Sequence, residues 1–213
     1  MFTTRTGLGA FLTAAALTLT AAPLAAATAD GRDQVAPART TTAPAFLTAA
    51  QMPPSATPWT AGAVTRGLPE TVPYCVKSAL PAQGTSHRTF RTELDTGGAQ
   101  ITTVAATDAA ASNLVTELRR LLANCATRVQ QEYPDVIAKG AYHGKLTVEE
   151  GAYVYSLDTA DPEVGNTDIA LYSVGRDGRT VTFVEWGQMG DLADAPLTAF
   201  KTTTRTAVNK LYG

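Results

Sequence analysis

The sequence holds few residues whose types and spacing suit hydrolysis. It has two histidines, His87 and His143, and no Gly-x-Ser-x-Gly nucleophile motif. Either histidine could meet a distant Ser and a carboxylate in space and form a catalytic triad, in which the imidazole takes the proton of the attacking hydroxyl. Isolated histidines are more often surface or loop residues. The sequence therefore predicts no enzymatic activity, and a secreted hydrolase of unrecognised type stays an alternative.

Acidic residues gather in one short segment, DTADPEVGNTD, residues 158–168. Its side chains are the hard oxygen ligands that calcium prefers, but their spacing does not match an EF-hand loop. Glu149 and Glu150 are neighbours only in sequence, because adjacent strand residues point to opposite faces of a sheet. No Cys/His spacing of a zinc site and no phosphate-binding glycine loop are found. We therefore predict neither a metal site nor a cofactor.

The segment VEWGQMGDLADAP, residues 184–196, joins an expected strand to an expected helix. We predict that Asp194 caps the helix and that Pro196 lies in its first turn, where a missing N–H costs nothing. The two glycines of the segment supply the turn itself. Three residues are left without such a role: Gln188, Met189 and Asp191.

The N-terminal 29 residues have the features of a secretory signal peptide. Arg5 precedes an apolar run over residues 8–22, and small residues follow it at two Ala-x-Ala sites, residues 25–27 and 27–29. The apolar run is shorter than the ~20 residues that span a bilayer. We therefore expect cleavage at either site, no membrane span in the mature chain, and secretion from the cell. Residues 30–45, rich in Thr, Ala and Pro, are expected to be a flexible leader before a domain over residues 46–213.

The charge balance argues against a nucleic-acid partner. The formal net charge is −2, and loss of Arg5 with the signal peptide would make it more negative by one unit. Nucleic-acid binding requires clustered Lys and Arg that displace phosphate counterions.

Two cysteines, Cys75 and Cys125, lie in the expected exported part. In an oxidising compartment, an even pair predicts one disulfide. Cys125 falls on the apolar stripe of a predicted helix, so the bond would tie that helix to the segment around Tyr74. Closing a loop of this length stabilises a fold by about 4 kcal/mol in the chain-entropy model.

The hydrophobic pattern predicts an α+β domain. A hairpin is expected around residues 95–98, a long helix from Thr107 or Asp108 to Pro134, and a final helix from Pro196 to Leu211. A short helical segment is expected before Pro53. Strands are expected within residues 142–150, 151–159, 167–175 and 179–186, the last two joined by an Asp-Gly turn. The resulting order predicts an antiparallel sheet with the two long helices packed on one face.

Five segments together resemble a group of actinobacterial exported sensor-domain proteins, which are similar to the extracellular domain of the mycobacterial receptor kinase PknH. The segments are FLTAAQMPPSATPW, LRRLLANCATR, YVYSLDT, VGRDGRTVTFVEWGQMGD and FKTTTRTAVNKLY. The resemblance spans roughly residues 46–212 and implies helices on a curved antiparallel sheet with a cleft for an unidentified ligand.

Two departures from this family matter. We expect neither a kinase domain nor a transmembrane segment beside the sensor-like part, and therefore expect this chain not to pass a signal to a cytoplasmic kinase itself. The kinase sensor has two disulfides, whereas only one pair is available here; the Cys75–Cys125 bond would match one of them.

The leading hypothesis is a secreted, non-catalytic binding domain whose cleft accepts a small molecule, a lipid or a glycan. An interaction module that docks an envelope protein through an apolar patch around Trp59 or Met189 is the alternative from another class. The candidate ligand-binding residues are Trp59, Tyr153, Tyr155, Trp186, Gln188 and Met189.

Overall fold

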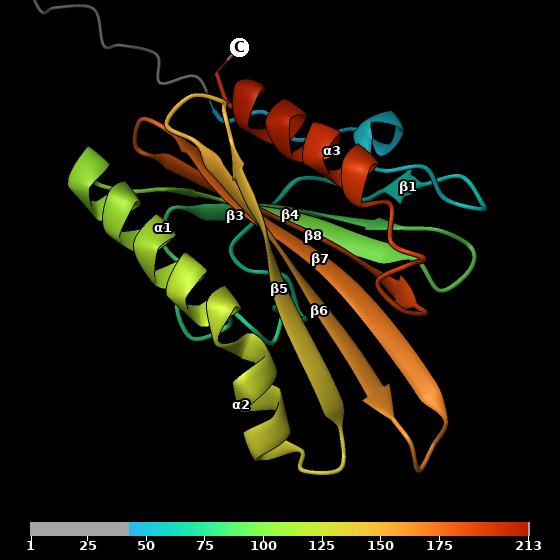
Figure 1. The fold of residues 1–213 in the computed structure, drawn as a ribbon. Helices are drawn as coiled ribbons and strands as arrows, with labels where there is room; N and C mark the ends of the chain where they lie inside the picture. Colours follow the sequence, from blue (N-terminus) through green and yellow to red (C-terminus); the bar gives the residue numbers. More distant parts are fainter. Residues whose placement is uncertain (1–42, 213) are drawn as a thin grey trace, which may run out of the picture. The chain divides into compact units, whose positions relative to one another are not determined.

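The computed structural model describes residues 43–212, which form one sheet with helices packed on it (Figure 1). The sheet has eight strands in the order β1-β3-β4-β8-β7-β6-β5, with β2 paired to β3, and every pairing is antiparallel. The predicted α+β class and antiparallel sheet are confirmed. The expected signal peptide and most of the expected leader lie outside the described residues.

The strands differ widely in length. Their bounds are β1 Thr60–Ala61, β2 Thr65–Arg66, β3 Thr85–Arg91, β4 Gly97–Val104, β5 Ile137–Leu146, β6 Ala152–Asp161, β7 Asn166–Asp177 and β8 Thr180–Met189. The helices are α1 Asp108–Ala123, α2 Cys125–Glu132 and α3 Leu197–Asn209, and a single 3-10 turn, η1 Ala49–Gln51, replaces the short helix expected before Pro53. No helix within residues 43–212 is long and apolar enough to span a bilayer.

The β7–β8 hairpin shows why these residues pair as they do. Its turn contains the predicted Asp-Gly pair, and Gly178 adopts a positive φ of 52°, which glycine reaches without strain. Pairing continues without a break from Asp177↔Thr180 to Asp168↔Met189. This register sets which side chain faces which side of the sheet along both strands.

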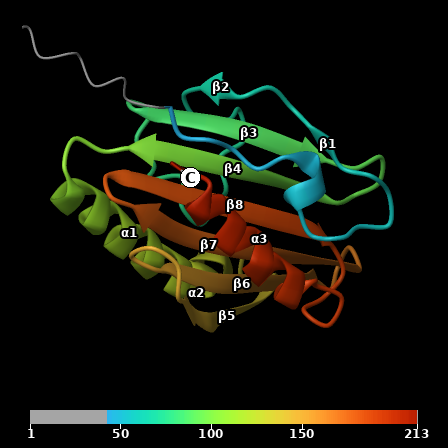
Figure 2. The same ribbon diagram turned by 90° about the horizontal axis from the view of Figure 1, so that it is seen from above.

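The central strands have apolar side chains on both faces, so the domain has two cores. Leu171 and Trp186 pair across β7 and β8 and belong to the core under α3, whereas Tyr172 belongs to the core under α1 and α2. The two long helices therefore cover opposite faces, as Figures 1 and 2 show, and the expectation that both pack on one face is wrong. The reason is that successive residues of a strand point to opposite faces, and here both sets need burial.

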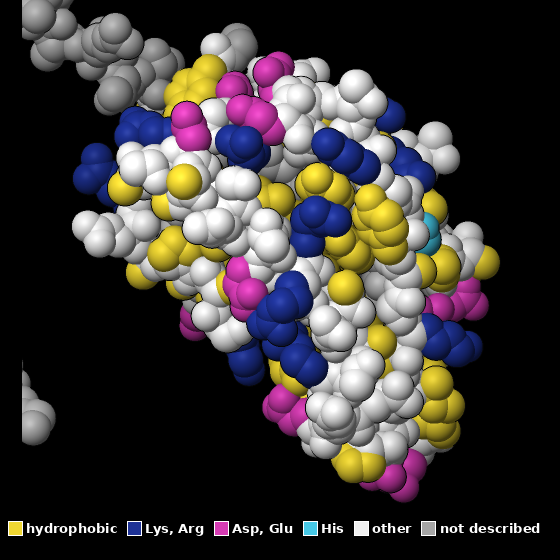
Figure 3. Space-filling model, turned by 60° about the vertical axis from the view of Figure 1, so that its left-hand side comes forward, with side chains coloured by type: hydrophobic (Ala, Val, Ile, Leu, Met, Phe, Trp, Pro, Cys, Tyr) yellow, Lys and Arg dark blue, Asp and Glu magenta, His cyan; other side chains and the backbone are white. Residues whose placement is uncertain are grey.

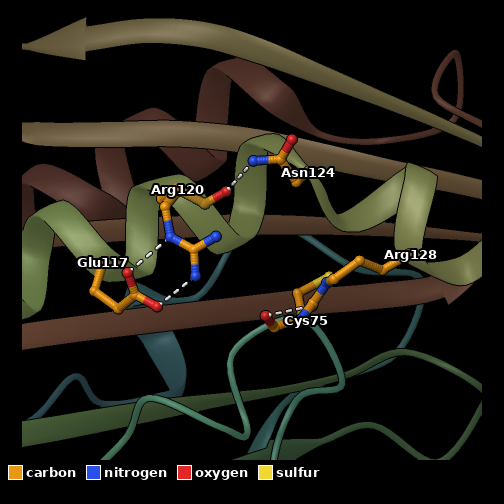
Figure 4. A network of polar contacts seen from close by, with 5 residues as sticks. All are labelled: Cys75, Glu117, Arg120, Asn124 and Arg128. Carbon is orange, nitrogen blue, oxygen red and sulfur yellow. Dashed lines mark hydrogen bonds and ion pairs between the residues drawn. The ribbon is translucent and has the colours of Figure 1, made fainter.

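The first long helix is interrupted at Asn124, which separates α1 from α2. The Asn124 side chain donates to the carbonyl of Arg120 at 2.8 Å (Figure 4), and the helix resumes at Cys125 in a direction that differs from that of α1 (Figure 1). Cys125 forms the predicted disulfide with Cys75, and Arg128 donates to the Cys75 carbonyl at 2.7 Å. These contacts hold the start of α2 against the segment that follows Tyr74.

The start of α3 differs from the prediction. Pro196 is its N-cap residue, and no side chain caps the helix. Asp194 instead accepts a hydrogen bond from the Asp191 N–H at 3.1 Å, so it stabilises the turn before the helix. Phe200, Ala207 and Val208 form the buried face of α3 that packs on the sheet.

Close packing of α3 on the sheet makes Gly175 sensitive to substitution. A Cβ atom at Gly175 would lie 2.6 Å from Val208 Cγ2 and 2.8 Å from Ala152 Cβ. We predict that Gly175→Ala lowers the free energy of unfolding by about 1–3 kcal/mol, because α3 must move outward to admit the methyl group. Urea unfolding followed by circular dichroism measures this loss.

The matched control is Gly97→Ala on β4, where the nearest atom to the added Cβ is the Phe90 carbonyl oxygen at 3.9 Å. This variant should change stability by no more than about 0.5 kcal/mol. Equal stabilities for the two variants would contradict the proposed packing of α3.

Candidate functional site

A groove of about 440 Å³ opens on the sheet face that α1 and α2 cover only in part. The helix pair starts beside the β7–β8 turn, where the Ala105 N–H donates to the Arg179 carbonyl at 2.9 Å, and ends over β5. It therefore runs diagonally (Figure 1), and the far ends of β4, β8 and β7 are left open on this face.

The floor of the groove is a row of small residues across three neighbouring strands. Gly97 on β4 pairs with Gly187 on β8, which pairs with Ala170 on β7. Residues directly opposite each other in an antiparallel sheet point to the same face, so three adjacent positions have almost no side chain. Leu157 on β6 continues the row and forms one wall.

The next row of the sheet forms the inner end of the groove. Glu185 on β8 pairs with Tyr172 on β7, and both line the groove. Tyr172 is buried and stacks on Phe183, with ring centroids 5.9 Å apart. Glu185 thus lies where the open groove meets the packed core under α1.

Burial gives Glu185 unusual acid–base properties. Its side chain is half-buried at the inner end of the groove, and desolvation raises its pKa from 4.5 to about 7. Among the described residues, no side chain or backbone group forms a hydrogen bond or an ion pair with its carboxylate. Burial also raises the pKa of the Tyr172 phenol, and the nearby Glu185 charge adds to that rise.

The outer end of the groove is held together by the β3–β4 loop. Asp95 in that loop accepts a hydrogen bond from the Met189 N–H at 3.0 Å, and the Thr96 hydroxyl donates to the Gln188 side-chain oxygen at 3.4 Å. These two contacts fix the end of β8 next to the loop. Asp95 and Asp168 both line the groove and are exposed.

The six predicted ligand-binding residues do not form one site. Only Gln188 and Met189 line the groove, and Met189 is 58% exposed. Trp186 is 1% exposed in the core under α3, and Trp59 packs against that same core with its indole N–H donating to the Pro53 carbonyl at 2.7 Å. Both tryptophans thus serve the core on the other face of the sheet.

The two predicted tyrosines lie beside the helices. Tyr155 is buried in the core under α1, and Tyr153 lies under the guanidinium of Arg119 at 3.7 Å from its ring centroid. Neither lines the groove. Sequence reasoning missed Glu185 as a site residue, although a glutamate that continues the inward face of Val181 and Phe183 is a signal that could have found it.

The histidines lie away from the groove. His87 Nδ1 is 2.8 Å from the Gly67 carbonyl oxygen, and His143 Nε2 is 2.8 Å from the Ser156 hydroxyl. Ser156 is only 4% exposed, and burial together with nearby Lys201 lowers the pKa of His143. This Ser–His pair therefore presents no accessible nucleophile.

The acidic segment at residues 158–168 has structural contacts. Asp161 accepts hydrogen bonds from the N–H groups of Glu163 and Val164, and Asp158 accepts one from the Leu192 N–H. Within the described part of the chain, no three His, Cys, Asp or Glu side chains are grouped as metal ligands.

No family model, no curated protein and no solved structure matches this chain in comparisons with known proteins.

The raised pKa of Glu185 predicts a pH-dependent stability. Between about pH 4.5 and pH 7 the unfolded chain loses the Glu185 proton while the folded chain keeps it, so the stability of the fold decreases as pH rises through this window. Glu185→Gln removes this effect. We predict that the variant gains about 1–3 kcal/mol relative to the wild type between about pH 4 and pH 8.

Urea unfolding at a series of pH values measures the difference. Glu163→Gln is the control, because Glu163 is exposed in a turn and lies outside the groove. A Glu185→Gln curve parallel to the wild-type curve would show that Glu185 is not desolvated.

Proposed function

We propose that residues 43–212 form a non-catalytic, sensor-like domain that binds a small molecule in this groove outside the cell. The observation that carries the proposal is the row of Gly97, Gly187 and Ala170, which leaves a hollow on the sheet, next to a half-buried carboxylate with no partner among the described residues. A folded chain gains no stability from either feature.

The groove has the size and lining of a ligand site. Small-molecule sites are concave, of roughly 300–1,000 Å³, and combine apolar walls with a few polar groups. Here Leu157 and Met189 supply apolar surface, while Glu185 and Asp95 supply the polar groups. The walls come from strands of a rigid sheet, which favours a preformed site.

The placement of nucleophiles supports a binding function over hydrolysis. Among residues 43–212, the lining contains no Ser, Cys, Lys or His. Its Thr159 hydroxyl donates to the Asp168 backbone carbonyl at 3.3 Å rather than to a basic side chain, so it does not resemble an activated nucleophile. The His143–Ser156 pair is formed by strands β5 and β6, and Ser156 is buried.

Two further observations support an extracellular place of action. The Cys75–Cys125 disulfide is of the kind that persists in oxidising compartments. The features of a signal peptide in residues 1–29 and the resemblance to exported sensor-domain proteins agree with it. A sensor role also requires a partner to receive the signal, and we propose an envelope protein for that part.

An interaction module is a second candidate function, favoured by an exposed aromatic and basic patch on the α1 side (Figure 3). Tyr142 is 52% exposed, and its ring centroid lies 5.1 Å from that of Tyr155. The cationic groups of Lys145 and Arg119 lie over the Tyr153 ring. Aromatic side chains and Arg are enriched in protein interfaces. This patch differs from the surface around Trp59 or Met189 that the sequence predicted.

A substitution that fills the groove tests the proposed function. Because a Cβ atom at Gly97 meets no atom nearer than 3.9 Å, Gly97→Phe should fold and place its ring over the groove floor. We predict that native mass spectrometry of the protein purified from its own host's culture medium shows an additional non-covalent mass on the wild type, which Gly97→Phe loses.

Gly97→Ala is the matched control and should keep the additional mass, since a methyl group leaves the groove open. The same mass on all three proteins would place the ligand elsewhere. A wild-type protein without additional mass would favour the aromatic and basic patch as the functional surface.

A further inference from the structure

We propose that the groove selects organic cations and that Glu185 receives the ammonium group of the ligand. This inference rests on the proposed function, because it assigns a chemical class to the ligand of the same groove.

The charged side chains that line the groove are all acidic. Asp95, Asp168 and Glu185 line it, and no Lys, Arg or His does. The nearest basic position in the pairing scheme is Arg91 on β3, opposite Gly97, and its side chain is exposed and outside the lining. A groove lined by charges of one sign concentrates ligands of the opposite sign.

Half-buried Glu185 has no ionic or hydrogen-bonding partner among residues 43–212. Its cross-strand neighbours on this face are Ala99 on β4 and Tyr172 on β7, neither of which is a cation. Removing a carboxylate from water is costly unless an opposite charge or hydrogen-bond donors compensate. A ligand ammonium at the inner end of the groove would supply both the charge and the donors.

The other groups of the groove favour an organic cation over a metal ion. A calcium or magnesium ion requires several oxygen ligands that converge within about 2.0–2.6 Å. The three carboxylates of the lining are not grouped in this way, because residues 43–212 contain no such cluster of three. Leu157, Met189 and the ring of Tyr172 instead offer apolar and aromatic surface, which suits the hydrocarbon part of an amine.

The assignment has a consequence for the pH dependence of binding. The titratable group next to Glu185 is the Tyr172 phenol on β7, and Asp95 and Asp168 lie farther along the groove. Strand β4 contributes no titratable group here, because its residue opposite Glu185 is Ala99. Ionised Glu185 attracts an ammonium group, whereas its protonated form does not. Amines should therefore bind more tightly near pH 8 than near pH 5.5.

The experiment is an NMR titration of the ¹⁵N-labelled protein with three ammonium probes and their neutral counterparts. The pairs are phenethylamine with phenethyl alcohol, cadaverine with pentanediol, and choline with dimethylbutanol. We expect at least one ammonium probe to shift the backbone amides of Gly97, Ala170 and Gly187, with affinity at least ten-fold higher than its neutral counterpart. The same affinity should fall about ten-fold near pH 5.5 and in the Glu185→Gln variant, and Glu163→Gln should leave it unchanged.

Each other outcome overturns the inference. Equal shifts from charged and neutral probes would show that the groove binds small molecules without selecting charge, so the proposed function would stand alone. Selective amine binding that Glu185→Gln leaves intact would assign the ammonium to Asp95 or Asp168. The cation class would be rejected if amide shifts occurred only outside the groove or with no probe at all. The Gly97→Phe comparison would then decide separately whether the groove holds a ligand.

Discussion

The alternation of side chains along the central strands governs the rest of the structure. In β6, β7 and β8, successive residues supply two different cores, as Leu171 and Tyr172 do on β7. A strand with apolar side chains on both faces is stable only when both are covered. The chain meets this constraint by placing α3 and residues 46–52 on one face and the α1–α2 pair on the other (Figure 2).

The incomplete cover of the second face creates the candidate site. The α1–α2 pair is bent at Asn124 and held at Cys125, so it follows a diagonal from the β7–β8 turn to β5. No helix of residues 43–212 contributes to the lining over the groove floor formed by Gly97, Gly187 and Ala170. Glu185 lies where the core under α1 meets the groove. The core shields it in part from water, and the groove gives a ligand access to it.

Much of the fold could be predicted from the sequence because its signals are local. The Asp-Gly turn between β7 and β8, the cap of α1 by Thr107 and the apolar stripe of α3 each depend on a few neighbouring residues. The disulfide followed from a cysteine pair without competitors. The covered face of each helix could not be predicted, since strands that are apolar on both faces accept a helix on either one.

The site was harder to predict because its main feature is an absence of side chains. Gly97, Gly187 and Ala170 are far apart in sequence and become neighbours only through the strand order β4-β8-β7. The sequence analysis instead chose large aromatic residues as ligand-binding candidates. Two of them, Trp186 and Tyr155, are core residues in the structure. Asp194 was assigned to a helix cap on spacing alone, although its carboxylate lies against the preceding turn.

The central claim is that Glu185 is a half-buried carboxylate at the inner end of an open groove, partly desolvated and without a partner among residues 43–212. The most direct measurement is a ¹³C NMR titration of the Glu185 carboxyl carbon in the ligand-free protein, assigned by comparison with Glu185→Gln. The structure predicts a midpoint at about pH 7. A midpoint near 4.5, the ordinary value for a glutamate, would show that water or an unrecognised donor already satisfies the carboxylate and would contradict this account of the site.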